Sequence, residues 1–322
     1  MKTTTTEAAA HIRAGELVAF PTETVYGLGA DASNDTAVAK IFAAKGRPAN
    51  HPLIVHIASD AQVLDYASSV PPFAKELMQA FWPGPLTLIL PRKPGVGTAA
   101  AGGQNSIGLR CPAHPLALEF LKACYQLGVS GVAGPSANKF GRVSPTTAQH
   151  VRDEFGDDLL VLDGGPCGVG IESSIVDCTR GQPVLLRPGV LTRQQLSNAC
   201  GQTVLTADEA LDNTPRAPGT LESHYAPNAK VRLMDAMAIQ TALDLLGADA
   251  AHIAVYARSI VRIKSSSVLY RRMPDDAIAT ASQLFAVLRD FDSQSVKLIW
   301  IEPVPGATEW DGVRDRLARA AS

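Results

Sequence analysis

Short apolar runs alternate with segments of helical periodicity along almost the whole chain. Runs with the length of buried strands lie at 17–20, 53–57, 86–90, 106–110, 129–133, 159–162 and 175–177. Helices are predicted at 72–81, 115–127 and 145–155. Another helix carries Val38, Ile41 and Phe42 on one face, behind a cap at Asn34 or Asp35. This alternation predicts an α/β fold whose sheet is either parallel or mixed.

The periodicity fades between about 206 and 228 and then resumes. The fading stretch is rich in Pro, Asp, Asn and Thr, a composition typical of a linker. Beyond it, strands are predicted at 231–234, 252–256, 268–271 and 297–301. Two helix faces are marked by Ile278, Ala281, Phe285 and Leu288, and by Trp310, Val313 and Leu317. The predicted organisation is a domain at 1–207, a linker at 208–228 and a smaller domain at 229–322.

The last predicted helix also carries three arginines. Arg314, Arg316 and Arg319 lie close together along it. Charged residues on a terminal helix usually face water, so we interpret them as a solvated face.

Charge and cysteine content argue against several classes of protein. The chain has 322 residues, with 29 Lys and Arg against 31 Asp and Glu, whereas a protein that depends on phosphate-backbone contacts is usually basic. Its five cysteines lack the spacing of a zinc knuckle or redox motif, which predicts free thiols in a reducing compartment. No apolar run approaches the ~20 residues that cross a bilayer, and residues 1–7 lack an apolar signal core. We therefore expect a cytoplasmic protein that does not contact the membrane.

The stretch 20–29, Phe-Pro-Thr-Glu-Thr-Val-Tyr-Gly-Leu-Gly, has the most unusual composition. It predicts a strand that runs into a turn carrying hydroxyls, a carboxylate, a phenol and two glycines. Loops that leave strand ends are where α/β proteins assemble binding sites, which makes Thr24 a candidate. The alternative is a turn that satisfies only its own backbone.

Cationic side chains follow the helix that contains Val38. In Lys-Gly-Arg-Pro at 45–48, the glycine suits the left-handed residue that ends a helix. Lys45 and Arg47 thus lie on a constrained loop, and His51 and His56 extend the same cationic strip. These groups suit a polyphosphate and a carboxylate, although cations at a helix end also complement its dipole.

Small residues follow the run at 129–133, in Gly-Pro-Ser-Ala-Asn at 134–138. They let a ligand approach the backbone, while Ser136 and Asn138 offer side-chain donors. Ser144, at the start of the helix predicted from 145, adds an N-terminal anion-binding environment. A plain turn is the alternative for 134–138.

Other polar positions lie at strand ends or in the linker. Arg110 ends the run at 106–110, where a structural ion pair is the alternative to a ligand contact. Ser174 precedes the run at 175–177, and Arg187 lies before a turn in Leu-Arg-Pro-Gly. His224 and Tyr225 lie in the linker, within Ser-His-Tyr-Ala-Pro. Because a linker needs only solubility, they favour a segment that folds back over a site.

No Walker-type phosphate loop, dinucleotide-binding fingerprint or hydrolase nucleophile elbow is present. The motifs that are present resemble, in their order, those of the Sua5/YrdC family. They are Pro-Thr-Glu-Thr-Val-Tyr-Gly-Leu-Gly, Lys-Gly-Arg-Pro, His-Pro-Leu, Gly-Pro-Ser-Ala-Asn, Glu-Ser-Ser-Ile-Val-Asp, Leu-Arg-Pro-Gly and Ser-His-Tyr-Ala-Pro. The length beyond them is similar to the long Sua5 form. The resemblance implies a YrdC-like twisted mixed α/β sheet with a concave, positively charged cavity, and a second, smaller Rossmann-like α/β domain.

The resemblance also implies an activity. L-threonine, bicarbonate and ATP would give L-threonylcarbamoyl-AMP and pyrophosphate, with ATP as a substrate and Mg²⁺ on its phosphates rather than at a metal site of the protein. The product would serve the threonylcarbamoylation of adenosine 37 in tRNA. Its implied partners are the tRNA-modification proteins that accept it, and a weak contact with tRNA is left open.

Site residues carry over from the family by matching motif. Those implied for threonine are Thr24, His56, Arg110 and Ser174, and those implied for ATP are Arg47, His51, Ser136, Asn138, Ser144, Arg187 and His224. Lys45 and Arg47 are the implied catalytic pair. The sequence departs from the family at Thr220, where the pattern has methionine, and this bears on how the linker packs.

Three other functions fit parts of the pattern. One is another carbamoyl-adenylate enzyme, like the YrdC-like part of hydrogenase-maturation carbamoyltransferases, but the chain lacks their cysteine pairs and length. The second is an RNA-binding or ribosome-assembly module, which the acidic balance disfavours. The third is a sensor that binds threonine without turnover.

Overall fold

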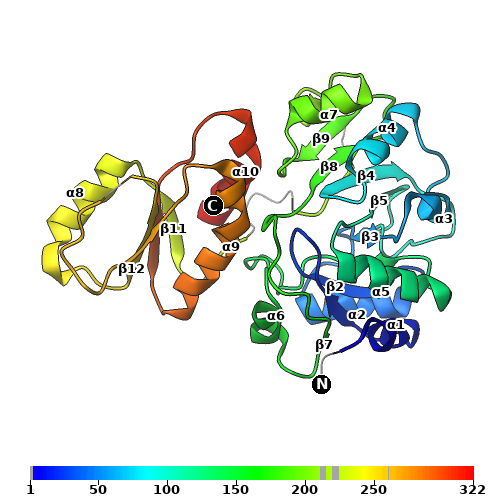
Figure 1. The fold of residues 1–322 in the computed structure, drawn as a ribbon, viewed down its shortest axis with the longest axis horizontal. Helices are drawn as coiled ribbons and strands as arrows, with labels where there is room; N and C mark the ends of the chain where they lie inside the picture. Colours follow the sequence, from blue (N-terminus) through cyan, green and yellow to red (C-terminus); the bar gives the residue numbers. More distant parts are fainter. Residues whose placement is uncertain (1–2, 211–214, 220–224, 260) are drawn as a thin grey trace.

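The computed structural model describes residues 3–210, 215–219, 225–259 and 261–322. Within them the chain forms two β-sheets with helices packed against them (Figure 1), which confirms the predicted α/β class. The first sheet is mixed and contains the strands of the N-terminal part. The second is parallel and contains those of the C-terminal part.

In the described residues, the first sheet has ten strands in the order β10-β9-β8-β4-β5-β3-β6-β2-β1-β7. They are β1 (Val18–Phe20), β2 (Gly27–Asp31), β3 (Ile54–His56), β4 (Leu86–Pro91), β5 (Ser106–Arg110), β6 (Val132–Ala133), β7 (Leu160–Val161), β8 (Ser174–Asp177), β9 (Val184–Arg187) and β10 (Leu205–Thr206). β3 is parallel to β5 and β4 to β8, whereas β4 and β5 are antiparallel. The helical elements of this part are α1 (Thr5–Arg13), α2 (Asp35–Lys45), η1 (Asp60–Gln62), α3 (Val63–Tyr66), α4 (Pro72–Phe81), α5 (Pro115–Gln126), α6 (Ala148–Phe155) and α7 (Arg193–Cys200).

Helix α2 shows how local sequence sets an element. The side chain of Asn34 accepts a hydrogen bond from the N–H of Ala37, so it is Asn34 that caps the helix. The helix ends at Gly46, whose φ of 64° is left-handed. Both ends lie where the sequence predicts them, and the apolar face of α2 is buried.

The two glycines of the stretch 20–29 lie in a strand rather than in a turn. Gly27 begins β2, which pairs antiparallel with β1. A Cβ at Gly27 or at Gly29 would lie less than 3.0 Å from a neighbouring side chain, the Phe20 ring and Val132 respectively. Glycine is therefore required there because bulky side chains cross the strand, and the turn prediction is wrong for these two residues.

The helix predicted from 145 begins later. Thr147 caps α6 by accepting a hydrogen bond from the N–H of His150, and the helix starts at Ala148. The carbonyl of Pro145 accepts a hydrogen bond from the N–H of Tyr26 instead of starting the helix. Ser144 is therefore not at a helix N-terminus, and that prediction is wrong.

The second sheet has the order β11-β14-β12-β13. It is built from β11 (Lys230–Leu233), β12 (Ile253–Ala257), β13 (Leu269–Arg272) and β14 (Leu298–Ile301), together with α8 (Ala236–Leu246), η2 (Gly247–Asp249), α9 (Ala277–Ser293), η3 (Thr308–Trp310) and α10 (Asp311–Ala321). Helix α8 packs on one face and α9 and α10 pack on the other. The predicted faces of the last two helices are buried except at Ile278, which is 68% exposed.

Helices α9 and α10 lie between the second sheet and the N-terminal part (Figure 1). One buried cluster joins Val25, Val143 and Ile171 to residues of α9 and α10. A Cβ at Gly170 would lie less than 3.0 Å from carbonyl oxygens of α9. The two parts are thus packed backbone to backbone as well as through side chains.

All five cysteines are free and buried. In the part of the chain that the structure describes, no helix is both long and apolar enough to cross a bilayer.

Candidate functional site

A cavity lies against one face of the first sheet. Ile54 and His56 both line it, and side chains two residues apart in a strand share a face. The predicted site residues in its lining are Thr24, Arg47, His56, Arg110, Ser136 and Arg187. These residues span more than half of the chain, and the fold brings them together in one cavity.

Arg110 is the centre of a polar cluster at the end of β5. Its Nη1 donates to Thr24 Oγ1 at 2.8 Å, and its Nη2 lies 2.7 Å from Glu23 Oε1. Thr22 Oγ1 lies 2.8 Å from Thr24 Oγ1. This cluster holds a buried guanidinium beside hydroxyls, an arrangement that binds a carboxylate.

His56 lies beside Arg110, at paired positions of β3 and β5. Burial, and then the charge of Arg110, lower the pKa of His56 to about 3. The ring is therefore neutral near pH 7. Its Nδ1 is buried without a hydrogen-bond partner among the described residues, which leaves a polar atom for a ligand.

Arg47 lies in the lining of the cavity, close to an aromatic ring. Its Nη2 donates to the carbonyl of Pro52 at 3.0 Å, and its guanidinium lies 5.7 Å from the centre of the Phe140 ring. His51 packs edge-on against the same ring, at 5.6 Å between centroids. Burial, and then the charge of Arg47, lower the pKa of His51. His51 therefore supports the Arg47 side of the cavity without being part of its lining.

Lys45 is not among the lining residues. Its buried ammonium donates to the carbonyls of Ser136 and Asn138. The side-chain amide of Asn138 donates to the carbonyls of Lys139 and Arg142 at 2.8 and 2.9 Å. Both predicted residues thus hold the loop that carries Ser136.

Ser144 and Ser174 are fully buried and also lie behind the lining. The hydroxyl of Ser144 donates to Glu172 Oε1, and that of Ser174 donates weakly to the carbonyl of Leu191 at 3.4 Å. Glu172 and Ser173 are in the lining instead. Sequence reasoning missed these two, although both belong to the quoted Glu-Ser-Ser motif.

Arg187 connects the cavity to the linker. Its Nη2 donates to the carbonyl of Ser173 at 2.9 Å, and its Nη1 donates to that of Pro218 at 2.9 Å. Pro218, Gly219 and Tyr225 line the cavity, so these three residues of the linker lie against it. His224 and Thr220 lie outside the described residues.

The interpretation of the last helix as a solvated face is wrong for Arg316, which is 0% exposed. Arg316 donates to Glu172 Oε2 at 2.9 Å and to the carbonyl of Pro188 at 2.7 Å. The sequence held a signal for this, since Arg316 is three residues after Val313 and four before Ala320, both buried. An arginine on the apolar face of a helix needs a buried partner.

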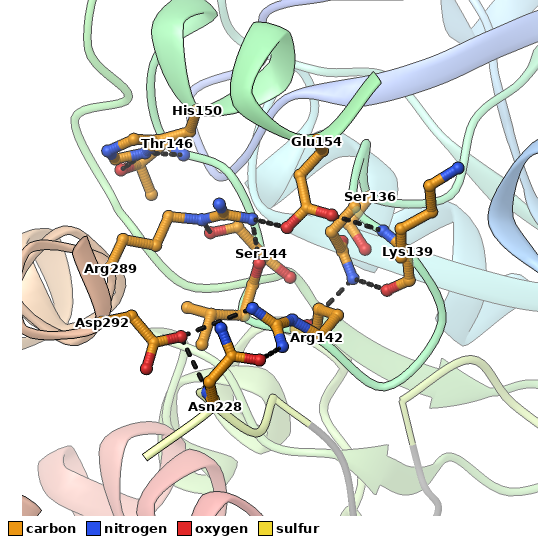
Figure 2. A network of polar contacts seen from close by, with 12 residues as sticks. Ser136, Lys139, Arg142, Ser144, Thr146, His150, Glu154, Asn228, Arg289 and Asp292 are labelled. Carbon is orange, nitrogen blue, oxygen red and sulfur yellow. Dashed lines mark hydrogen bonds and ion pairs between the residues drawn. The ribbon is translucent and has the colours of Figure 1, made fainter. Parts of the chain in front are cut away.

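The loop between β6 and α6 is also held from the C-terminal part (Figure 2). Arg289 of α9 donates to the carbonyl of Ser144 at 3.3 Å and to Glu154 at 2.8 Å. Asp292 lies 3.4 Å from Arg142 and accepts the N–H of Asn228 at 2.8 Å. One helix of the second part therefore anchors both this loop and the end of the linker.

The cavity carries a positive charge. Arg47, Arg110 and Arg187 line it, while the carboxylates of Glu23 and Glu172 pair with Arg110 and Arg316 respectively. Arg47 and Arg187 therefore supply the excess positive charge. No group of three or more His, Cys, Asp or Glu side chains within the described ranges is placed to hold a metal ion. The donor set suits anions rather than a bound cation.

A mixed α/β sheet with buried arginines, hydroxyls and small-residue backbone around one cavity is suited to small anionic ligands. A family model described as "Telomere recombination", which covers Sua5, YciO and YrdC, matches residues 10–189. A second, described as "Threonylcarbamoyl-AMP synthase, C-terminal domain", matches residues 191–322. The chain belongs to the Sua5/YrdC family, in its long Sua5 form.

Curated relatives and a solved structure agree with this. A threonylcarbamoyl-AMP synthase of Bacillus subtilis is 39% identical over 98% of this chain and 92% of its own length. A protein of the same name from Schizosaccharomyces pombe is 35% identical over 95% of this chain and 85% of its own length. The crystal structure of Sua5 from Pyrococcus abyssi complexed with L-threonine matches with a TM-score of 0.88 and 37% identity, over 98% of this chain and 94% of that one.

Proposed function

We propose that the protein is an L-threonylcarbamoyladenylate synthase, which makes threonylcarbamoyl-AMP and pyrophosphate from L-threonine, bicarbonate and ATP. The observation that carries this is the convergence of Thr24, Arg47, Arg110 and Arg187 on one cavity. Relatives that carry the name threonylcarbamoyl-AMP synthase match nearly the whole chain, which supports the substrates. The reaction makes the enzyme a nucleotidyltransferase.

Threonine binds at the Arg110 cluster. The guanidinium of Arg110 is fixed by Thr24 and Glu23 before any ligand arrives, so it pairs with the amino-acid carboxylate at little entropic cost. His56, which is neutral and has an unpartnered Nδ1, hydrogen-bonds the substrate without adding a further positive charge.

ATP binds at the opposite group of residues. Arg47 and Arg187 offset the charge of its phosphates, and Ser136 lies on the loop of small residues whose backbone a ligand can approach closely. Lys45 and Asn138 keep that loop in place through its carbonyls. We propose for Lys45 a positioning role beside Arg47.

The chemistry requires two anions to meet. The neutral amine of threonine takes up bicarbonate with loss of water and forms a carbamate. A carbamate oxygen then attacks the α-phosphorus of ATP, and pyrophosphate leaves with the electrons of the broken P–O bond. The arginines offset the combined charge, and holding the reactants in line supplies much of the remaining rate.

Glu172, the carboxylate in the cavity lining, is paired with Arg316. We propose that Mg²⁺ arrives on the ATP phosphates with water as its other ligands. The product passes to the tRNA-modification proteins that act on adenosine 37, in the cytoplasm, where ATP and tRNA are present.

Mass detection of threonylcarbamoyl-AMP tests the proposal. Purified protein incubated with ATP, threonine and bicarbonate should form it, and omission of any one substrate should abolish it. Serine in place of threonine serves as a control that tests whether the methyl group of the substrate is needed. Threonine binding without a new adenylate would show a sensor instead, and the proposed activity would be withdrawn.

A further inference from the structure

Helix α10 of the second part lies on the side that faces the N-terminal part of the chain (Figure 1). A Cβ at Gly312 would lie less than 3.0 Å from the carbonyl oxygen of Gly189, so the helix backbone touches that turn directly. Gly189 is two residues beyond Arg187, which lines the cavity. Arg316 is one helical turn further along the same side of α10, which places its side chain in the first part of the chain.

Arg316 uses its guanidinium to hold several pieces of that wall. It donates to Glu172 Oε2 at 2.9 Å, to the carbonyl of Glu172 at 3.1 Å and to that of Pro188 at 2.7 Å. It also lies 5.4 Å from the centre of the Tyr225 ring in the linker. Asp315 Oδ2, 2.9 Å away, completes its partners. Such a fully buried charge is stable only with partners of this kind.

Glu172 is the carboxylate that needs this partner. Glu172 lines the cavity, and its Oε1 accepts a hydrogen bond from the hydroxyl of Ser144. Burial alone would raise the pKa of Glu172, but Arg316, Arg187 and the Ser144 hydroxyl outweigh it and lower the pKa. The group is therefore ionised, in a cavity that has to accept a triphosphate.

We propose that Arg316, contributed by the second domain, is a positioning residue for ATP: it cancels the charge of Glu172 in the cavity wall and keeps that carboxylate turned toward Ser144 and away from the nucleotide. The inference rests on the proposed function. It gives the C-terminal domain a direct part in nucleotide binding, through one side chain that touches no substrate.

Substitution of Arg316 and substitution of Glu172 should have different effects on the KM for ATP. In Arg316→Met, Glu172 is left as an unpaired carboxylate facing the cavity, and the KM for ATP should rise about tenfold to 100-fold. The KM for threonine at saturating ATP should stay within about threefold, because the Arg110 cluster is untouched. In Glu172→Gln, the repelling charge is gone and the amide oxygen still accepts from Ser144, so the KM for ATP should not rise even if kcat falls.

A purely structural role for the Arg316–Glu172 pair, in which it only holds the two parts together, leads to a different expectation. Either substitution would then lower stability and activity alike, with no preference for ATP. The double variant Arg316→Met with Glu172→Gln separates the two cases, since the charge argument expects it to recover most of the ATP affinity lost in Arg316→Met. Arg314→Met is the matched control, because Arg314 lies on the same helix, is partly exposed and pairs locally with Asp311.

The measurements are threonine-dependent pyrophosphate release and calorimetric binding of ATP, after the wild type has been shown to form threonylcarbamoyl-AMP. If the wild type forms none, the proposed function fails. If it does, and Glu172→Gln raises the KM for ATP as much as Arg316→Met, only the inference is overturned. Should Arg316→Met not fold, Arg316→Gln replaces it, because glutamine keeps a hydrogen-bond donor but removes the charge. That variant should raise the KM for ATP about tenfold, whereas a KM within about threefold of the wild type would reject the charge argument.

Discussion

The charged side chains around the cavity are almost all buried, and each has a fixed partner. Arg110 and Arg187 bond neighbouring groups of the first sheet, while Arg316 enters from the other domain. Arg47 is the exception in part, because its Nε is buried without a hydrogen-bond partner among the described residues. A buried donor without a partner needs an explanation such as water or a ligand, and Arg47 lines the cavity.

Arg47→Ala should therefore affect ATP more than any other substrate. We expect kcat/KM for ATP to fall about 100-fold, as when one preorganised donor is lost from a site that stabilises negative charge. Pyrophosphate release at varied ATP measures this. Lys75→Ala, which removes an equal charge from the exposed side of α4, is the control. Equal activity of the two variants would place the phosphates elsewhere.

His56 makes stability depend on pH. Its pKa is about 3 in the fold and about 6.5 in the unfolded chain, so between these values only the unfolded state binds the proton. The contribution is fully present above pH 6.5 and is lost as pH falls toward 3, by about 1.4 kcal/mol per pH unit. The free energy of unfolding, measured with urea between pH 4 and 7, should fall less steeply with decreasing pH in His56→Gln than in the wild type.

His150 provides an internal comparison for this slope. Burial, followed by the charge of Arg289, lowers its pKa to about 4. His150→Gln should also reduce the loss of unfolding free energy as pH falls, over the narrower range from pH 6.5 to pH 4. An unchanged slope in His56→Gln would mean that this imidazole is hydrated and titrates normally.

At the scale of elements, the approach of α10 to the Gly189 turn depends on one glycine. Alanine in a helix normally stabilises by about 1 kcal/mol relative to glycine. At Gly312, however, a Cβ would meet backbone, which cannot rotate away. We expect Gly312→Ala to lower the free energy of unfolding by about 1–3 kcal/mol, as measured with urea.

Gly306→Ala is the matched control for that substitution. Nothing lies within 4 Å of the position a Cβ would take at Gly306, and alanine there should be neutral or slightly stabilising. A stabilised Gly312→Ala protein would show that α10 does not sit as close to the turn as the structure places it.

At the scale of the whole molecule, the two parts should unfold together because they share one buried cluster. Ile171 belongs to that cluster, although it comes from the N-terminal part. Ile171→Ala should cost about 2–5 kcal/mol and split a single calorimetric transition into two. Ile239→Ala, in the cluster confined to the second sheet, should lower stability without removing this coupling. Two transitions in the wild type would contradict the shared core.

Much of the fold follows from local sequence. Apolar runs of strand length, the cap at Asn34 and the left-handed Gly46 act over a few residues, and the elements they predict are present. The errors have physical causes that lie outside the local window. Gly27 and Gly29 face the Phe20 ring, and the carbonyl of Pro145 accepts a hydrogen bond from Tyr26. The hydrophobic periodicity of the sequence does not reveal which residues make these contacts.

The motifs by themselves determined the α/β class, the two sheets and the residue types that gather in the cavity, because periodicity and turn chemistry are encoded within a few positions. Only the tertiary structure decided that Ser173, in the loop before β8, lines the cavity, whereas Ser174 begins the strand and is buried behind the lining. It also decided that Arg316 is buried against Glu172. The burial of a helical arginine depends on what packs over it, and here that surface lies 144 positions earlier in the chain.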